Sequence, residues 1–504
     1  MPKLYVFAIG GTGSRVVKSL TMLLASGIKT NYEIVPIILD PDAAAADVEK
    51  TTRILNNYKA VNKYVNLSAE NSLFKNKIES LGDVVNPKTN ENISNEFRLN
   101  INDLHGGSFR SFIDFNLLEG KGENEALIEL LFSDQNLNLD LEVGFQGNPN
   151  IGSVVLNKFV DSPEFIQFAQ NFTDQDRIFI ISSIFGGTGA AGFPLILKNI
   201  REGKFQGQHY EHLRNAVVGA ITVLPYFKLD GDVESAIQSS TFISKTKAAL
   251  SYYHTNISSS HAVNALYYIG DTASNNYKNI VGGSEQKNDA HFIELAAAMA
   301  VLDFVADESL RSMSGRALTP KYKEFGIDSI DASNPVITFP NLALATQNLI
   351  KENLSQLFFT TLYLDNELAL QMKAPFAANQ PAIDKNFLTS HFYQSLQNFQ
   401  REFKIWLAEL KRNKISFSPY EISVEADMNG NVTGFSTSKR DIFTLLHGVP
   451  KKSAGLNFLK NKSYDVITGN LNTIEKSRTF ISAESKMLEL FTEATKQSIN
   501  KELF

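Results

Sequence analysis

The chain has 504 residues, of which 43% are hydrophobic and 20% are charged, and its formal net charge at pH 7 is -6. This composition excludes a wholly disordered chain, and the length favours about two to four domains. The acidic balance argues against a large surface for nucleic acid or for an anionic membrane. The sequence has no cysteine, which excludes disulfides, thiol catalysis and cysteine-ligated metals.

Targeting and membrane signals are missing from the sequence pattern. Residues 1–13 lead directly into an apolar run and a glycine turn, without the basic region and cleavage site of a signal peptide. No uncharged apolar run reaches the roughly 20 residues that a spanning helix needs. We therefore expect a cytoplasmic protein without membrane insertion.

Alternating strands and helices are predicted for the first part of the chain. Nearly continuous apolar runs, typical of strands buried on both faces, occur at 4–9, 33–39, 177–184, 216–224 and 263–269. Helical patterns follow at 14–25, 193–201 and 235–253. This order predicts an α/β fold, with a mostly parallel sheet and helices on both of its faces.

Other segments interrupt or follow this alternation. The polar stretch from about 47 to 143 is interpreted as a helical insertion. A pattern that is apolar around the whole helical wheel predicts a buried central helix at about 289–309. Residues 310–504 are expected to form a mainly helical C-terminal region. One β-hairpin is predicted near 420–437, because Asn429-Gly430 is a strong hairpin turn.

Two further helices are predicted in the C-terminal region. Between Phe392 and Leu410, apolar residues alternate at spacings of four and three, which indicates an amphipathic helix. This seam spans fewer than three heptads, so packing within its own domain is favoured, with a partner helix as the alternative. A final helix is expected from about 474 to the end.

Two glycine turns, at 10–13 and 186–189, each follow a buried strand and precede a helix. Glycine lets backbone N–H groups approach phosphate oxygens, and a helix N-terminus adds a favourable dipole. One such turn fits a plain strand–helix connection equally well, but two on neighbouring strands favour a polyphosphate held from both sides. Neither turn continues as a Walker A loop. The first, with Asp40 as a possible ribose-binding acid, resembles a dinucleotide-binding fingerprint, but Val16 replaces its third glycine.

The second turn, within 185–192 (FGGTGAAG), resembles the GGGTG(S/T)G signature of the tubulin/FtsZ GTPases. Four other segments follow that family's order. They resemble its first phosphate loop, its γ-phosphate loop, its ribose loop and the strand before its base-reading residue, at 10–15, 144–152, 221–231 and 266–271. The resemblance covers about residues 1–309 outside the insertion. It implies a GTP-binding domain that takes GTP or GDP with Mg²⁺ and that assembles with copies of itself into filaments or oligomers.

The resemblance also implies roles for the matched residues of the phosphate and ribose loops. The phosphates would be held by Gly10, Gly11, Thr12, Gly13, Ser14, Gly186, Gly187, Thr188, Gly189 and Ala190. Gly147 and Asn148 would close over the γ-phosphate, and Pro225 and Asp230 would lie at the ribose.

At the base, Arg15 stands where the family has Asn, and Asp271 takes the place of the base-reading Asn. His291 or Phe292 would stack on guanine, and Glu294 would accept hydrogen bonds from its N1–H and amino groups. An ionised carboxylate only accepts, so Glu294 suits that edge, whereas adenine has no N1 proton. We therefore expect GTP to bind well and ATP poorly. The alternative for Glu294 is a local cap or ion pair.

Hydrolysis in this family uses acidic residues from the next subunit of a filament. No such string follows the central helix here, and Asp328 and Asp331 are the best substitutes as catalytic acids. The resemblance therefore implies tight GTP binding with slow turnover that a neighbouring subunit completes. A valine at Gly187 or Gly189 is expected to abolish binding without unfolding the chain.

Two other functions are alternatives. The C-terminal third lacks the strand-rich second domain of the family, which favours a non-polymerising GTP switch that binds a partner protein through this region. An NAD(P)-dependent oxidoreductase would use the first turn and Asp40, but a dinucleotide fold needs only one glycine turn. His209 and His212 have no third ligand nearby in the sequence, so no protein-held metal site is predicted.

Overall fold

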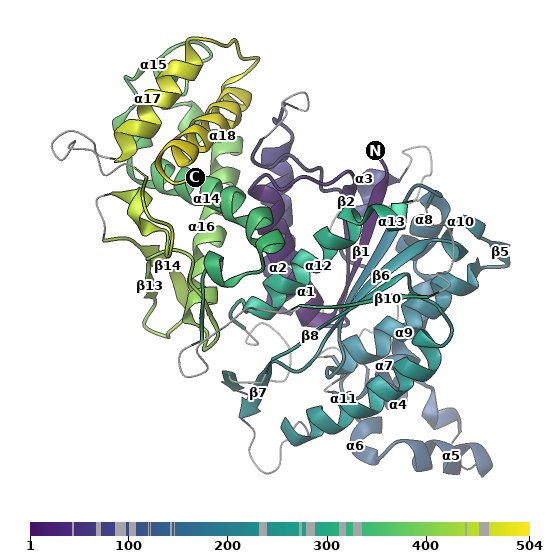
Figure 1. The fold of residues 1–504 in the computed structure, drawn as a ribbon. Coiled ribbons are helices and arrows are strands. Elements are labelled where there is room, and N and C mark those ends of the chain that lie inside the picture. Colours follow the sequence, from purple (N-terminus) through teal and green to yellow (C-terminus); the bar gives the residue numbers. More distant parts are fainter. Residues whose placement is uncertain are drawn as a thin grey trace.

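A computed structural model describes residues 1–42, 45–66, 72–85, 97–99, 107–118, 120, 122–141, 144–145, 147–230, 239–271, 275–278, 288–311, 319–325, 335–438, 441–452 and 463–504. A six-stranded sheet lies at its centre (Figure 1). The strands are β1 (Lys3–Ile9), β2 (Glu33–Leu39), β3 (Arg177–Ser183), β6 (Val217–Val223), β8 (Ala265–Ile269) and β10 (Lys321–Glu324). All neighbours are parallel, in the order β10-β8-β6-β3-β1-β2.

The apolar runs predicted as strands form the first five of these strands. Burial on both faces explains their composition, since every residue of β3 and of β6 is buried. β10 was not predicted. Its sequence, KYKE, is polar because it is an edge strand and none of its residues is fully buried.

Helices cover both faces of the sheet (Figure 1). On the face toward the C-terminal region lie α1 (Gly10–Ala25), α2 (Ala46–Asn62) and α12 (Phe292–Ala306). On the opposite face lie α7 (Pro149–Leu156), α8 (Pro163–Asn171), α9 (Gly187–Glu202) and α11 (Ser239–Tyr253). The side chains of β1 show the division, because Ala8 faces Gly13 of α1 while Phe7 packs on Phe168 of α8.

The predicted central helix is α12, and it is buried around its whole circumference. Every residue from 292 to 302 is buried, as expected for a helix that lies between the sheet and the C-terminal region. Its N-terminal turn reaches the carboxyl ends of the strands, so it contributes side chains to the same edge of the sheet as the glycine turns.

The described part of the predicted insertion contains mostly short helices joined by irregular segments. These helices are most of α2, and then α3 (Leu81–Val84), α4 (Phe109–Phe112), α5 (Glu123–Leu131) and α6 (Asp134–Leu137). α2 packs against α1 and belongs to the helical layer over the sheet. Ile78 and Arg98 make single parallel bridges to Ile34 and Ile38, which partly cover the free edge of β2.

The C-terminal region is mainly helical, as predicted, and consists of α14 (Leu344–Asn366), α16 (His391–Arg412), α17 (Ser463–Glu475) and α18 (Ala483–Glu502). The predicted hairpin is β13 (Ser423–Ala426) with β14 (Val432–Ser436). The predicted start of the final helix, near residue 474, is wrong. α17 ends at Glu475, and Ser482 caps the separate helix α18.

The smaller elements are β4 (Lys204–Phe205), β5 (Gln208–His209), β7 (Phe227–Asp230), β9 (Asn275–Lys278), β11 (Val336–Ile337), β12 (Ser416–Phe417), α10 (Glu211–Arg214), α13 (Glu308–Arg311) and α15 (Pro375–Ala378). Among the described residues, no helix has both the length and the apolar character needed to cross a bilayer.

Candidate functional site

The two glycine turns lie at the carboxyl ends of β1 and β3, which are neighbours in the sheet. The chain continues from β1 to β2 on one side, and from β3 to β6 on the other. The direction of the strand order therefore reverses between β1 and β3, and α1 and α9 leave on opposite faces. Open α/β sheets bind their ligands in the crevice at such a switch point.

Three of the predicted phosphate segments meet at this point. Gly10 has a φ of +72°, and a Cβ on it would lie 3.5 Å from the Cβ of Thr188. A Cβ on Gly187 would lie 3.1 Å from the backbone nitrogens of both Gly147 and Asn148. The two glycine turns and the segment before α7 thus line one place, where Thr188, Gly147 and Asn148 are partly exposed.

The glycine turns are the first turns of helices, which differs from the predicted loops. α1 begins at Gly10 and α9 begins at Gly187, and neither has a side-chain cap on its N-terminus. The first N–H groups of a helix have no partner within it, and the helix dipole makes this end favourable for anions. Two uncapped helix starts side by side suit a ligand with several negative charges.

Two of the predicted phosphate glycines have a packing role. A Cβ on Gly13 would lie 2.6 Å from the carbonyl carbon of Ala8, and one on Gly189 would lie 2.4 Å from the carbonyl oxygen of Ser183. Both contacts are too short for any side chain, so these glycines let α1 and α9 pack closely on their strands. A valine at Gly189 would therefore disturb the fold itself, contrary to the expectation of a clean binding defect.

Arg15, in the first turns of α1, forms a buried network. Its Nε donates to Oε1 of Glu294 at 2.5 Å, its Nη1 to Oδ2 of Asp47 at 2.5 Å, and its Nη2 to the hydroxyl of Tyr226 at 2.8 Å. The Tyr226 hydroxyl in turn donates to Oε1 of Glu294 at 2.7 Å. Arg15 is 4% exposed and Glu294 is 0% exposed. The sequence left open a local cap or pair for Glu294, but this ion pair joins residues 279 positions apart.

The second oxygen of Glu294 belongs to a capping box at the start of α12. Oε2 accepts from the backbone N–H of His291 at 3.0 Å. Both carboxylate oxygens of Glu294 therefore accept hydrogen bonds within the chain. Oε1 accepts two hydrogen bonds and Oε2 accepts one, so Glu294 cannot take both donors of a guanine in this conformation. Its base-reading role stays a prediction that requires the network to open.

His291 caps α12 through its ring. Its Nδ1 accepts from the backbone N–H of Ile293 at 3.0 Å, which leaves Nε2 as the protonated nitrogen of the neutral ring. Burial lowers the pKa of His291, against the opposing effect of Glu294 and Asp271, and so favours this neutral form. Nε2 is buried and has no hydrogen-bond partner among the described residues.

The structure separates the two residues that were expected to stack on the base. The His291 ring lies 5.0 Å from that of Tyr226, within the Arg15 network. The Phe292 ring instead packs on Phe325 and Phe417, at 5.8 and 5.6 Å, on the side of the C-terminal region. Only the His291 ring therefore lies on the side of the Arg15 network, where it is fully buried.

The remaining predicted residues follow or end strands, except the two expected catalytic acids. Asp40 follows β2, where burial raises the pKa of its carboxyl to about 7. Pro225 follows β6, Asp230 ends β7 and Asp271 follows β8, all at the carboxyl edge of a strand. The expected catalytic acids, Asp328 and Asp331, lie outside the described residues.

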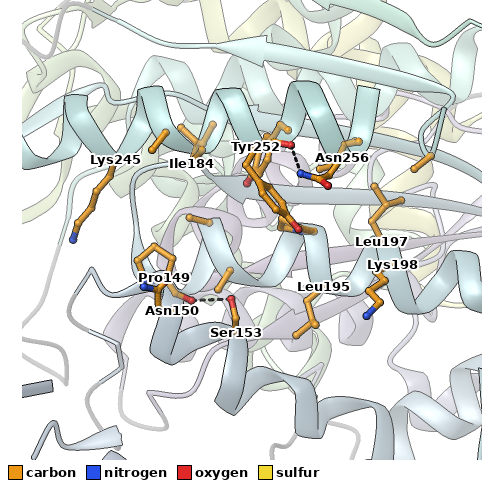
Figure 2. Close-up of a pocket in the computed structure, with 18 of the residues that line it drawn as sticks. Pro149, Asn150, Ser153, Ile184, Leu195, Leu197, Lys198, Lys245, Tyr252 and Asn256 are labelled. Carbon is orange, nitrogen blue, oxygen red and sulfur yellow. Dashed lines mark hydrogen bonds between the residues drawn. The ribbon is translucent and has the colours of Figure 1, made fainter. Parts of the chain in front are cut away.

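Sequence reasoning missed Asp47, Tyr226 and Lys245. Tyr226 adjoins the predicted Pro225, but the sequence shows no signal for Asp47. Lys245 of α11 donates to the carbonyl of Gly147, and burial lowers the pKa of its ammonium group. It stands at one end of a groove of about 890 Å³ between α7, α9 and α11 (Figure 2). Asn150 and Ser153 of α7 and Leu195 of α9 line the same groove (Figure 2).

Similar solved structures include CetZ from Methanosaeta thermophila strain DSM 6194 (12% identity, TM-score 0.25), covering 61% of this chain and 56% of that one. CetZ2 from Haloferax volcanii, a GTPγS-bound protofilament, has 12% identity and a TM-score of 0.28, with 61% of each chain covered. CetZ1 from Haloferax volcanii, a GDP-bound monomer, has 14% identity and a TM-score of 0.28, with 61% and 62% covered. The chain thus spans less than two thirds of the length of these relatives. No protein-family model and no curated protein matches it.

The segments predicted to hold phosphate occur in the predicted chain order, at the switch point of a parallel sheet, beside the N-terminus of a buried central helix. The six-stranded parallel sheet, its two helical layers and the helical C-terminal region fit a tubulin/FtsZ-like α/β fold.

Proposed function

We propose that this chain binds GTP or GDP where the two glycine turns meet the segment before α7, and that the bound nucleotide controls self-assembly into filaments or oligomers. The convergence of Gly10, Thr188 and Gly187 with Gly147 and Asn148 carries this proposal. It supplies backbone N–H groups from two uncapped helix starts to one polyphosphate.

Mg²⁺ is part of the proposal. It binds phosphate oxygens with only one or two protein ligands and keeps several waters. The Thr188 hydroxyl belongs to the part of the site that is partly exposed and is the side chain that we expect nearest to the ion. The ion would neutralise charge on the phosphates during hydrolysis.

Hydrolysis would be slow in a single chain. Phosphoryl transfer needs a group that positions the attacking water, and we propose that Asp328 and Asp331 supply it to a neighbouring copy. The enzyme would then be complete only between subunits, so assembly and turnover would be linked.

A GTP switch without polymerisation is the second candidate. It is favoured by the buried contacts between α1, which begins at the phosphate site, and α16 of the C-terminal region. Lys18 donates to Glu409 at 3.2 Å, and the Trp406 indole donates to Ser19 at 3.1 Å. Through these contacts, a conformational change at the first glycine turn would reach the C-terminal region, where a partner protein could bind.

The binding proposal is tested with Gly187→Ala. The added methyl group would crowd the backbone nitrogens of Gly147 and Asn148, and we expect it to weaken GTPγS binding at least about tenfold in calorimetry with Mg²⁺. Gly469→Ala is the matched control, because no atom lies within 4 Å of its added Cβ and it lies in α17. Wild-type affinity in a folded Gly187→Ala protein would refute the phosphate site.

Self-assembly is tested by sedimentation of the full chain with GTPγS, with GDP and without nucleotide. We expect more rapidly sedimenting material with GTPγS than with GDP. Tight nucleotide binding by a chain that stays monomeric at every concentration would favour the switch instead.

A further inference from the structure

We propose that Arg15 sets the base preference of this site by holding Glu294, so that the site accepts purine nucleotides in general and binds ATP nearly as well as GTP. This inference rests on the proposed nucleotide site and replaces the expectation that Glu294 selects guanine. Arg15 is a positioning residue here, because it acts on the base through Glu294.

The network around Arg15 is closed. Four N–H groups of its guanidinium are engaged, with Thr12 at 3.3 Å as the fourth partner beside Glu294, Asp47 and Tyr226. The Tyr226 hydroxyl uses its proton for Glu294 and a lone pair for Arg15. The cluster therefore ties α1, α2, the segment after β6 and α12 together. Oε1 of Glu294 accepts two hydrogen bonds and Oε2 accepts one, so the two adjacent donors of a guanine cannot both be accepted while Arg15 holds Oε1.

A guanine would compete poorly for Glu294. Its N1–H and amino group are neutral donors, and their bonds to the Glu294 carboxylate would be charge-assisted only through the acceptor. Arg15 brings a full opposite charge to the same buried carboxylate as well. Tyr226, Glu294 and Asp47 outweigh the burial of Arg15, which alone would lower its pKa, and hold that pKa above its usual value. Releasing Glu294 would also leave the buried guanidinium with one carboxylate fewer.

His291 presents a donor that suits any purine. Its Nε2–H is buried and unpartnered among the described residues, while its Nδ1 is occupied by the cap of α12. Guanine and adenine both carry a ring-nitrogen acceptor at N7, and both have a large face on which a neighbouring ring can stack. A base that reached this buried donor would meet it with a feature that the two purines share, while Arg15 holds the residue that could tell them apart.

The experiment compares GTPγS, ATPγS and UTP binding to the full-length protein by calorimetry. For the wild-type protein we expect ATPγS to bind within about fivefold of GTPγS, and UTP to bind at least about tenfold more weakly than either. Glu294→Gln should leave the GTPγS-to-ATPγS ratio within about twofold of the wild-type ratio, and His291→Phe should weaken both purine nucleotides to the same extent.

The decisive variant is Arg15→Gln combined with Asp47→Asn, which removes the cation and one carboxylate together. Glu294 then keeps only neutral donors, the Tyr226 hydroxyl on Oε1 and the His291 N–H on Oε2. The GTPγS-to-ATPγS ratio should therefore rise at least about tenfold, while Arg15→Lys, which keeps the cation, keeps the wild-type ratio. A GTPγS-to-ATPγS ratio above about five in the wild-type protein, or a change of more than about twofold in Glu294→Gln, would overturn the inference and leave the nucleotide site standing. A folded wild-type protein that binds neither purine nucleotide would refute the proposed function itself. If the double variant does not fold, the wild-type ratio and Glu294→Gln alone decide.

Discussion

Among single residues, Asp40 makes stability depend on pH. Burial raises the pKa of its carboxyl to about 7, and the nearby Asp42 carboxylate adds to this effect, although the Asp42 N–H donates to it at 3.1 Å. An unfolded chain ionises this group near pH 4. Ionisation in the folded state therefore costs free energy that is absent below about pH 4 and complete above about pH 7.

We accordingly predict that Asp40→Asn stabilises the protein at pH 8 by at least about 1 kcal/mol and has little effect at pH 4. Urea unfolding at the two pH values measures the difference. A stabilisation that is equal at both pH values would show that the Asp40 pKa is not raised. The glycine turns contain no side chain that titrates. We therefore expect Asp40→Asn to change the free energy of unfolding without changing phosphate binding.

Because Gly189 has no side chain, α9 can pack closely on β3. A Cβ added to Gly189 would lie 2.4 Å from the Ser183 carbonyl oxygen and 2.8 Å from the Ser183 nitrogen, and backbone cannot yield as a side chain does. We predict that Gly189→Ala lowers the free energy of unfolding by about 1–3 kcal/mol, measured by chemical denaturation. Gly469→Ala is the control, since its Cβ meets open space. Unchanged stability of Gly189→Ala would mean that α9 can move away from β3 at little cost.

At the scale of elements, Glu409 joins the glycine-turn helix to the C-terminal region. Its carboxylate accepts from Lys18 of α1 at 3.2 Å, from Lys50 of α2 at 2.9 Å and from the backbone N–H of Ala290, just before α12, at 3.0 Å. Burial alone would raise the pKa of Glu409, but the two ammonium groups outweigh it and lower the pKa to about 2. Three helices, α1, α2 and α16, and the segment before α12 thus meet at one buried anion.

Glu409→Gln should therefore lower the free energy of unfolding by roughly 3 kcal/mol at pH 7, because Lys18 loses its buried partner. A depressed carboxyl pKa adds stability above the unfolded pKa near 4.5, and that stability is lost as the pH falls through about 2. The difference between wild type and Glu409→Gln should thus shrink between pH 5 and pH 2 in denaturant titrations. A difference that stays constant over this range would contradict the ionic role of Glu409.

At the scale of the whole molecule, turnover should depend on contact between copies of the chain. If Asp328 and Asp331 act across an interface, GTP turnover per chain rises with protein concentration, because the occupied fraction of the interface rises. Asp328→Asn and Asp331→Asn should then stop turnover and leave GTPγS affinity unchanged. Phosphate release measured over a range of protein concentrations tests this prediction. Rapid hydrolysis by a dilute monomer would place every catalytic group within one chain.

The sequence alone determined the core of the fold. β3 and β6 could be predicted because a central strand of a parallel sheet is buried on both faces and must be apolar throughout. The all-round apolar pattern predicted α12, and Asn429-Gly430 predicted the turn between β13 and β14. Local sequence suffices in these cases because burial and turn geometry constrain residues that are adjacent in the chain.

The tertiary structure alone decided what faces the candidate site. Arg15 meets Asp47, Tyr226 and Glu294 across 32, 211 and 279 residues of sequence, and no local pattern encodes such a meeting. His291 and Phe292 are neighbours in sequence, yet one points into the Arg15 network and the other into the C-terminal region. A helix start turns successive side chains in different directions, so the packing around α12 determines which of them reaches a ligand.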